Sequence, residues 1–306
     1  LTADTAGLTL TCSATSAGGT SSQTVTIYRD ATAPGIVASR SPEPNSEGWN
    51  NTPVLVTFAC TDLTSGVAVC GPDQTVSTEG AGQSVTGTAT DHAGNSDTAT
   101  VANIDIDLTA PAVSFAGGPV DGGVYYFGSV PAAPSCDATD TLSGVSAAGC
   151  GVSGYSSSVG VHTMTAAASD RAGNTTSVER TYTVLAWTLT GFYRPVDMPV
   201  TTLDMVYNTV KGGSTVPLKF EVFAGPTELT TTSTILSFGV VRLTCVSGAS
   251  EDAIEVTTTG STSLRYDSDS GQFVQNWQTP KTAGSCYKVT LVTQDGSTVI
   301  AYFKTK

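Results

Sequence analysis

The sequence has few of the side chains on which most catalytic and nucleic-acid sites depend. Its 306 residues include two histidines and 7% aromatic residues, and 13 Lys and Arg stand against 26 Asp and Glu, a net charge of −13. Nucleic acids and anionic membranes are bound by clustered Lys and Arg, so neither is an expected partner. No apolar run approaches the roughly 18–20 residues of a membrane span, which excludes membrane insertion.

Catalytic motifs are also missing. The sequence contains no Gly-x-Ser-x-Gly, no His-Glu-x-x-His and no Walker loop. His92 and His162 lie in different parts of the chain, so a shared histidine site is not expected. We therefore predict that the protein is not an enzyme and that it holds no cofactor other than, at most, Ca²⁺.

The charge that is present is distributed unevenly along the chain. Residues 1–187 contain four basic and 16 acidic side chains, whereas residues 188–306 contain nine basic and ten acidic ones. The first lysine of the chain is Lys211. Two compositions indicate two kinds of module.

The acidic part contains an internal repeat. The motif Asp-x-Thr-Ala-Pro begins at Asp30 and again at Asp107, and the motif Asp-x-Ala-Gly-Asn begins at Asp91 and again at Asp170. A Ser-Gly-Val turn between two cysteines lies between these motifs in both copies. A period near 80 residues is too long for a solenoid and is typical of a small β-sandwich repeated in tandem.

The local pattern is that of strands throughout. β-Branched residues in period-two alternation recur between short turns rich in Gly, Asn, Asp and Pro, as in the runs 23–28, 54–58, 83–88 and 179–184. No segment has a convincing helical period. We predict an all-β chain in which tandem immunoglobulin-like β-sandwiches form an elongated array, followed by a C-terminal antiparallel β-sandwich domain.

Two family resemblances refine this prediction. The two Asp-x-Thr-Ala-Pro starts, Gly48-Trp-Asn-Asn-Thr-Pro53, Ser-Gly-Val and the two Ala-Gly-Asn turns make residues 31–187 resemble the tandem immunoglobulin-like repeats of large bacterial, often actinobacterial, surface and secreted proteins. Residues 188–306 resemble the PxKF domain, a C-terminal module of similar proteins, at the segments 191–196, 208–213, 217–220, 271–273, 286–287 and 303–304 and at Trp277. Such modules imply spacing and display outside the cell.

The repeats and the resemblances together give four segments. Residues 1–30 read as the C-terminal part of an incomplete immunoglobulin-like domain, 31–107 and 108–187 as complete domains, and 188–306 as the PxKF-like domain. In the last segment, two strand-like runs flank Asp295-Gly296, a strong hairpin signal. A second hairpin turn is expected at Asp267–Gly271, which lacks the further acidic ligands of a calcium loop.

Seven cysteines indicate the compartment. The pairs Cys60/Cys70 and Cys136/Cys150 each bracket a Ser-Gly-Val turn, while Cys245 and Cys286 lie in strand-like sequence of the last segment. We predict these three disulfides, which place the protein outside the cytoplasm, secreted or at the cell surface.

Cys12 is then without a partner in the chain. One interpretation is that it pairs with a cysteine upstream of Leu1, the chain being the C-terminal portion of a longer protein. Another is that a strand from another subunit completes the first domain, as in strand-exchange filaments. A free thiol is the third.

Candidate binding residues fall into two groups. Carboxylates beside the disulfides and at a domain junction are candidates for Ca²⁺, with turn capping as the alternative interpretation: Asp62, Asp105, Asp107, Asp137 and Asp140. Aromatic side chains are candidates for carbohydrate contact, with a core role as the alternative: Trp49, Tyr125 and Tyr126.

The function that we expect from the sequence is structural. The chain is predicted to be a non-catalytic extracellular stalk that spaces and displays domains, with other domains of the same longer protein as its partners. Three alternatives stay open: an adhesin or carbohydrate-binding appendage that contacts glycans, a subunit that assembles with copies of itself in a surface layer or filament, and an accessory tail of a secreted hydrolase.

Overall fold

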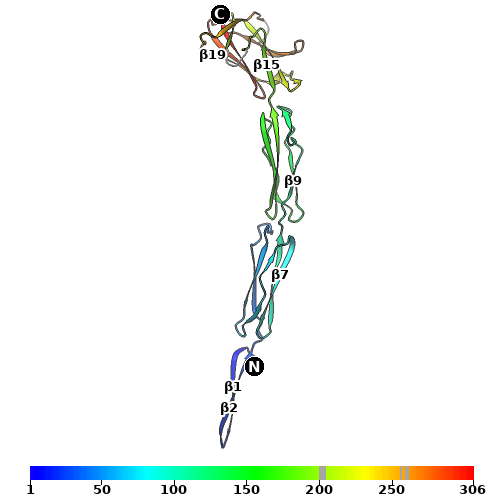
Figure 1. Cartoon of the computed structure of the whole chain (residues 1–306), viewed down its shortest axis with the longest axis vertical. Coiled ribbons are helices and arrows are strands. Elements are labelled where there is room, and N and C mark those ends of the chain that lie inside the picture. Colours follow the sequence, from blue (N-terminus) through cyan, green and yellow to red (C-terminus); the bar gives the residue numbers. More distant parts are fainter. Residues whose placement is uncertain (200–204, 256, 259–261) are drawn as a thin grey trace. The chain divides into compact units, whose positions relative to one another are not determined.

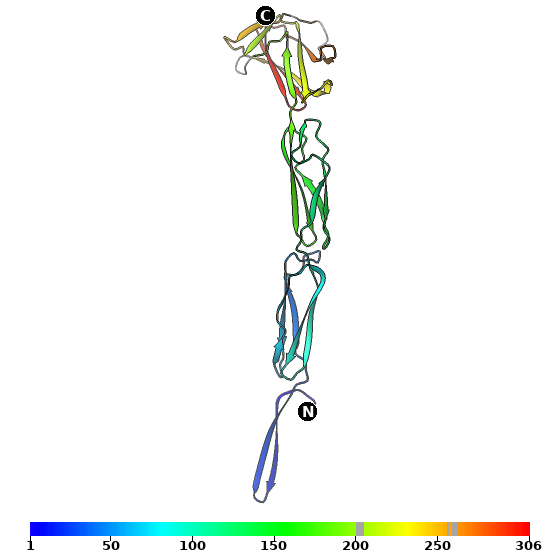
Figure 2. The same cartoon turned by 45° about the vertical axis from the view of Figure 1, so that its right-hand side comes forward.

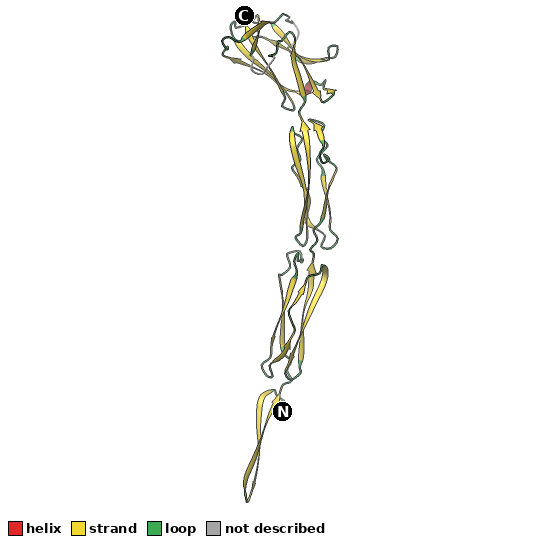
Figure 3. Cartoon of the chain, in the orientation of Figure 1, coloured by secondary structure: helices red, strands yellow, loops and turns green. Residues whose placement is uncertain are grey.

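Strands make up nearly all of the regular structure (Figure 3). The structure is a computed structural model, and it describes residues 1–199, 205–255, 257–258 and 262–306. One short 3₁₀ turn, η1 (Thr232–Thr234), is the exception among these residues. No helix in the described part of the chain is long and apolar enough to cross a membrane. The expected all-β class is confirmed.

The chain divides into two compact units. The first contains residues 1–116, 135–152 and 165–178, and the second contains residues 117–134, 153–164 and 179–306. The division passes through β12 (Val145–Ser153), β13 (Gly160–Asp170) and β14 (Thr175–Leu185). Each unit is therefore described by itself.

The first unit begins with a hairpin of β1 (Thr5–Ser16) and β2 (Gly19–Arg29) (Figure 1). The strands pair antiparallel from Leu8↔Ile27 to Ser16↔Gly19. Figure 2 shows that no further strand lies alongside them, and within the described residues they form a sheet of two. Cys12 is exposed on β1 and forms no disulfide with another cysteine of the described residues.

The following residues of the first unit form two facing three-stranded sheets. One has the order β3 (Gly35–Ser41), β4 (Val54–Thr61), β6 (Gln74–Val76), and the other the order β5 (Val67–Cys70), β7 (Gly80–Asp91), β8 (Ser96–Ile106). Alternate apolar residues of β4, β7 and β8 point inward and make the core, namely Val54, Val56, Val85, Ile104 and Ile106. The Cys60–Cys70 disulfide joins β4 of one sheet to β5 of the other.

The next repeat has the same plan with fewer strands on one side. β9 (Ala112–Ala116) pairs antiparallel with β11 (Ser135–Thr139). The other sheet has the order β10 (Val124–Tyr126), β14, β13, β12, and β10 lies parallel to β14. The Cys136–Cys150 disulfide joins β11 to β12.

The second unit ends in a larger sandwich of two five-stranded sheets. The first has the order β15 (Thr188–Tyr193), β17 (Thr215–Ala224), β22 (Gln272–Gln278), β21 (Leu264–Asp267), with β18 (Thr227–Glu228) also on β17. The second has the order β19 (Ile235–Leu243), β23 (Cys286–Thr293), β24 (Thr298–Thr305), β16 (Val206–Val210), β20 (Ser250–Ala253). Their facing apolar residues form one core that includes Phe220, Phe273, Trp277 and Phe303.

Both hairpins expected in this sandwich are confirmed. β23 and β24 pair antiparallel around Asp295-Gly296, and β21 and β22 pair around the Asp267–Gly271 turn. Asp295 accepts hydrogen bonds from Ser297 and from the backbone N–H of Trp187, at 2.6 Å, so this turn also holds the start of the domain. β16 departs from the antiparallel expectation, because it lies parallel to both β24 and β20.

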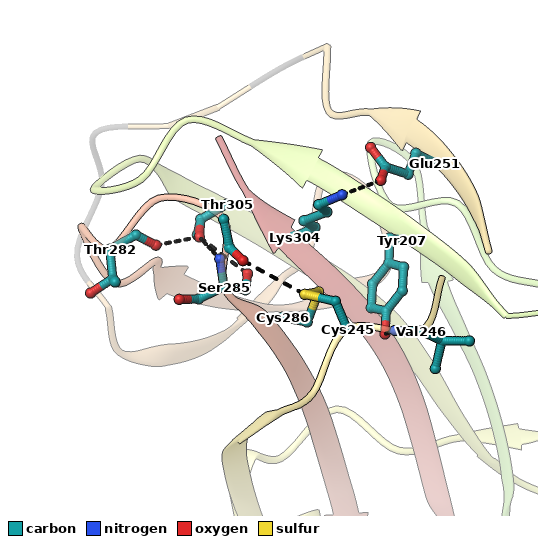
Figure 4. Close-up of a disulfide and its surroundings, with 10 residues drawn as sticks. Tyr207, Cys245, Val246, Glu251, Thr282, Ser285, Cys286, Lys304 and Thr305 are labelled. Atoms are coloured by element: carbon teal, nitrogen blue, oxygen red, sulfur yellow. Dashed lines mark hydrogen bonds and ion pairs between the residues drawn. A yellow bond between two sulfur atoms is a disulfide. The ribbon is translucent and has the colours of Figure 1, made fainter. Parts of the chain in front are cut away.

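The third disulfide, Cys245–Cys286, closes one end of the β19–β23 pair (Figure 4). Cys286 is fully buried. Beside the bond, the Tyr207 hydroxyl accepts a hydrogen bond from the backbone N–H of Val246 at 3.2 Å, and Lys304 forms an ion pair with Glu251. The disulfide therefore anchors the segment after β19 to the first residue of β23.

Candidate metal centres

Three carboxylates converge where the chain enters the first complete repeat. Asp30 follows β2, Asp62 follows β4, and Asp91 is the last residue of β7. One oxygen of each lies within 4.8 Å of an oxygen of each of the others. The trio forms because β4 and β7, on opposite sheets, end at the same edge of the sandwich where Asp30 begins the repeat.

Backbone N–H groups orient these carboxylates. Asp62 Oδ1 accepts hydrogen bonds from the backbone N–H of Thr64 at 3.1 Å, Ser65 at 2.9 Å and Gly66 at 2.7 Å. Gly66 has a φ of +82°, which a residue with a side chain rarely adopts, so glycine at this position lets the loop wrap around the Asp62 oxygen. Asp30 Oδ2 accepts a further bond from the Ser65 N–H at 3.1 Å.

The Asp-x-Ala-Gly-Asn turn holds the third carboxylate. The Asn95 backbone N–H donates to Asp91 Oδ1 at 2.8 Å, and its side-chain Nδ2 donates to Asp91 Oδ2 at 2.7 Å. The same Nδ2 lies 3.4 Å from the carbonyl oxygen of Asp30 and 3.3 Å from that of Thr32. Asn95 thus ties Asp91 to the segment between β2 and β3 that enters the repeat.

The second repeat has the same arrangement. Asp107, Asp140 and Asp170 also place their oxygens within 4.8 Å of one another. The Ser143 N–H donates to Asp107 Oδ2 at 3.0 Å, and Asn174 Nδ2 donates to Asp170 Oδ2 at 2.7 Å and to the Asp107 carbonyl at 2.9 Å. Two sites with the same residues at the same places show that the arrangement is a property of the repeat.

Burial and charge make these trios unusual. Asp107 is fully buried, and Asp91 and Asp170 are each 2% exposed. Like charges this close repel one another, and burial adds to the cost of keeping them ionised. Backbone N–H donors offset part of that cost. The pKa of Asp30 is held below its usual value, chiefly by the Ser65 hydroxyl and the Thr32 N–H.

The donor set fits a hard cation such as Ca²⁺, which prefers carboxylate, carbonyl and hydroxyl oxygens. The Oγ atoms of Ser65 and Ser143 are buried and make no hydrogen bond of acceptable geometry, although the Ser65 hydroxyl lies against the Asp30 carboxylate. Within the described residues, Oδ2 of Asp62 and Oδ2 of Asp140 accept no hydrogen bond. Each repeat therefore keeps oxygen donors free beside its carboxylates.

The sequence candidates for Ca²⁺ are only partly brought together. Asp62, Asp107 and Asp140 belong to the trios. Asp105 instead accepts the Gly82 N–H within the β7–β8 sheet, and Asp137 is exposed on β11. These two side chains lie outside both trios, because position beside a disulfide or a junction does not determine which way a strand residue points.

Sequence reasoning missed Asp30, Asp91 and Asp170 as metal candidates. Each is the first residue of a repeated motif, Asp-x-Thr-Ala-Pro or Asp-x-Ala-Gly-Asn. That recurrence was the available signal. A motif taken alone does not reveal that the ends of distant strands meet.

The aromatic candidates do not form a stacking surface. Trp49 is half-buried in the loop before β4. Tyr125 and Tyr126 are neighbours on β10 and point to opposite sides of the strand. The Tyr125 ring packs edge-on against Tyr182, with centroids 6.3 Å apart, and the Tyr126 ring covers Gly225 so closely that a Cβ there would lie 2.6 Å away.

A further acidic pair lies in the last sandwich. Asp197 is held by Asn208, whose Oδ1 accepts the Asp197 N–H at 2.7 Å, and Asn208 pairs in register with Asp252 across β16 and β20. The pKa of Asp197 is raised, first by its hydrogen bond with Asp252 and then by burial. A raised pKa means that the protonated Asp197 carboxyl contributes to the stability of the fold. This contribution is lost as the pH rises through the pKa of Asp197 in the folded protein.

Replacing Asp252 by asparagine is expected to stabilise the last sandwich near pH 7, because the substitution removes one of the two facing charges. The gain in melting temperature should disappear in acid. Asp197 is then protonated in the unchanged protein, so the repulsion that the substitution removes is already absent. Thermal melts at a series of pH values measure both. A loss of stability at pH 7 would contradict the repulsion that we infer.

Similarity to known proteins is limited to solved structures. No protein-family model and no curated protein sequence matches this chain. Similar solved structures include titin domains I67–I69 in an E-to-A variant, at 9% identity over 90% of this chain and 99% of that one, with a TM-score of 0.26. They also include the protocadherin GammaB4 extracellular domain, at 13% identity over 97% of this chain and 55% of that one, with a TM-score of 0.29.

These neighbours consist of immunoglobulin-like and cadherin-like β-sandwich domains. The chain spans about half of the protocadherin chain that it matches. Identities of 9% and 13% and TM-scores of 0.26 and 0.29 decide neither the family nor the function of this chain. The assignment of tandem β-sandwiches therefore rests on the sheets and cores described above.

Proposed function

We propose that this chain is a non-catalytic extracellular structural segment that spaces and displays domains, and that Ca²⁺ bound where the chain enters each repeat stiffens it. One observation carries the proposal: the same three carboxylates, with the same serine and asparagine around them, occur at the entrance of both repeats. A site repeated once per domain suits a mechanical role better than a single reaction.

The residues indicate how an ion would act. Asp30 and Asp107 belong to the chain as it enters a repeat, whereas Asp62 and Asp91, or Asp140 and Asp170, belong to the repeat itself. A cation held by all three would cross-link the entering segment to the end of the sandwich. It would also neutralise the charge repulsion within each trio, which favours the closed arrangement over an opened one.

The disulfides support the extracellular assignment. Each of the three sandwiches contains one, and bonds of this kind persist in oxidising compartments. They also limit unfolding where no chaperone acts. In the first repeat, the Cys60–Cys70 bond lies close to the metal candidate, because Asp62 follows Cys60 by two residues.

We further propose that residues 31–187 are immunoglobulin-like repeats of the bacterial surface-protein type and that residues 188–306 are a PxKF-like module. The support is the set of motif residues in the sequence together with the sandwich that each segment forms. The Asp-x-Thr-Ala-Pro and Asp-x-Ala-Gly-Asn motifs have a structural role here, because each supplies one carboxylate of a trio.

Small-angle X-ray scattering of the whole chain tests the spacing role. We expect an extended particle, with a larger radius of gyration and maximum dimension in Ca²⁺ than in EDTA because bound ions restrict bending at the repeats. The matched control is the Asp62→Asn/Asp140→Asn variant, whose profile should not respond to Ca²⁺. A compact globule in both buffers would overturn the spacer role.

A further inference from the structure

The β1–β2 hairpin has two chemically different faces. On one face, hydroxyl groups pair across the strands, as at Ser13–Ser22 (2.8 Å) and Thr15–Thr20 (3.0 Å). The residues between them point to the other face, which carries Leu8, Leu10, Cys12, Ala14, Val25 and Ile27, with Ser21 and Gln23 near the turn. This amphipathic pattern is that of a sheet with one face toward solvent and one toward a core.

The apolar face is nevertheless open. Leu10 is 49% exposed and Val25 is 58% exposed. A two-stranded hairpin alone is only marginally stable in water, and it gains stability when its apolar face is covered. The hydroxyl ladder on the opposite face cannot replace that burial, because exposed hydroxyl pairs exchange with water at little net gain.

The first complete repeat shows what covers this face. Its β7–β8 hairpin is the equivalent of β1–β2, since Asp107 follows β8 as Asp30 follows β2. The turn of the β7–β8 hairpin is one residue longer than that of the β1–β2 hairpin, since Asp91 and Asn95 close the former and Ser16 and Gly19 close the latter. Counted back along the strand from Ser16 and Asp91, Leu10, Cys12 and Ala14 take the places of Val85, Gly87 and Ala89. Val85 and Ala89 are 7% and 0% exposed, because the β3–β4–β6 sheet lies over them.

One contact locates the partner of Cys12. The ring of Phe58, on the middle strand of the covering sheet, lies directly on Gly87, where a Cβ would come within 2.5 Å of it. Cys12 occupies the place of Gly87, so its side chain points toward the residue that stands where Phe58 stands. The space between these two facing positions is too short for two large side chains. A cysteine facing Cys12 would fit, because the two sulfur atoms would bond as a disulfide.

We propose that the apolar face of β1–β2 is the docking surface for a three-stranded β-sheet of the same polypeptide, encoded before Leu1, whose middle strand presents a cysteine to Cys12. The source is argued from the repeats: in each, the strands that cover the hairpin precede it in the chain. Forming the bond removes one hydrogen from each thiol, and a disulfide of the oxidising compartment accepts the two protons and two electrons.

The direct test is peptide mapping, by mass spectrometry under non-reducing conditions, of the protein isolated from its natural source. We expect the peptide with Cys12 to be joined to a peptide of the same polypeptide from before Leu1. The proposal is overturned if Cys12 is a free thiol, or if it is joined to a second copy of this chain or to another protein.

The geometric premise is tested in the chain itself by the double variant Phe58→Cys/Gly87→Cys. We expect the two new thiols to oxidise to a disulfide, so that thiol titration finds only Cys12. The matched control is Phe58→Cys/Thr86→Cys, because Thr86 points to the outer face, where it pairs with Thr100. In the control both new thiols should remain free.

If the Phe58→Cys/Gly87→Cys variant folds and both new thiols stay free, the placement of the partner cysteine opposite Cys12 is overturned. Circular dichroism of each variant establishes whether it has folded, and the mapping of the natural protein decides the proposal where a variant has not. Neither measurement depends on Ca²⁺, so failure here is distinct from failure of the calcium proposal.

Discussion

Calcium at ten times its dissociation constant is expected to raise the melting temperature of each repeat by about 5–10 °C. Binding at that concentration stabilises a folded site by about 1.4 kcal/mol, and a domain of about 80 residues shifts by several degrees for each kcal/mol. Differential scanning calorimetry in EDTA and in millimolar Ca²⁺ measures the shift. Millimolar Mg²⁺ should have less effect, because it gives up its water ligands reluctantly.

The variants Asp62→Asn and Asp140→Asn separate the two sites. Each asparagine keeps the Oδ1 acceptor that the backbone N–H groups need and replaces only Oδ2, which accepts no hydrogen bond among the described residues. Asp62→Asn should therefore remove the response of the first repeat alone, and Asp140→Asn that of the second. Without Ca²⁺ both variants should be at least as stable as the unchanged protein, because a repelling charge is gone.

The control for these variants is Asp137→Asn. Asp137 is an exposed acidic residue of the second repeat that lies outside the trio, so its loss should leave the Ca²⁺ response intact. Equal melting temperatures in EDTA and Ca²⁺ for the unchanged protein would contradict the calcium sites. So would a full response from the Asp62→Asn/Asp140→Asn double variant.

Removal of the Cys245–Cys286 disulfide by alanine substitution is expected to cost the last sandwich about 4 kcal/mol. The bond spans 41 residues, and the chain-entropy model assigns more stability to longer loops. The position of the bond adds to this expectation, because it closes the β19–β23 pair where Cys286 is fully buried. Denaturant unfolding can follow the fluorescence of Trp277, which is 7% exposed in this core.

The Cys60→Ala/Cys70→Ala variant is the comparison. That bond spans 10 residues, for which the same model gives about 3 kcal/mol, and it lies in the first unit of the chain. It should leave the unfolding of the last sandwich unchanged. If the Cys245→Ala/Cys286→Ala variant lost less than about 1 kcal/mol, the disulfide would not be a principal constraint on this domain.

Much of the architecture could be predicted because its causes are local. Alternating β-branched residues mark strands, as in β4, and Asp295-Gly296 marks the turn between β23 and β24. The disulfide pairing could also be predicted from the sequence, since each of the first two cysteine pairs brackets a short turn. The parallel pairing of β16 with β24 was not, because nothing in a strand's own sequence states which way its neighbour runs.

The metal candidates also combine features with a local cause and features that depend on long-range packing. The repeated Asp-x-Ala-Gly-Asn motif indicates that Asp91 and Asp170 have a common role. The hydrogen bonds from the backbone N–H groups of Asn95 and Asn174 to these carboxylates explain the turns that they begin. That Asp91 meets Asp30, 61 positions earlier in the chain, depends on two sheets that pack with their ends aligned. Asp105 and Asp137 seemed equivalent candidates, yet the direction of their side chains removes them from both sites.

An all-β chain of acidic repeats with disulfides, a near-neutral last domain and a seventh cysteine without a partner could all be read from the sequence, because composition, alternation and turn residues act over a few positions. The packing of the sheets settles which carboxylates share a site, which aromatic rings are covered and which face of the first hairpin is open. Those properties depend on contacts between residues far apart in the chain, and the packing of one sheet on another brings such residues together.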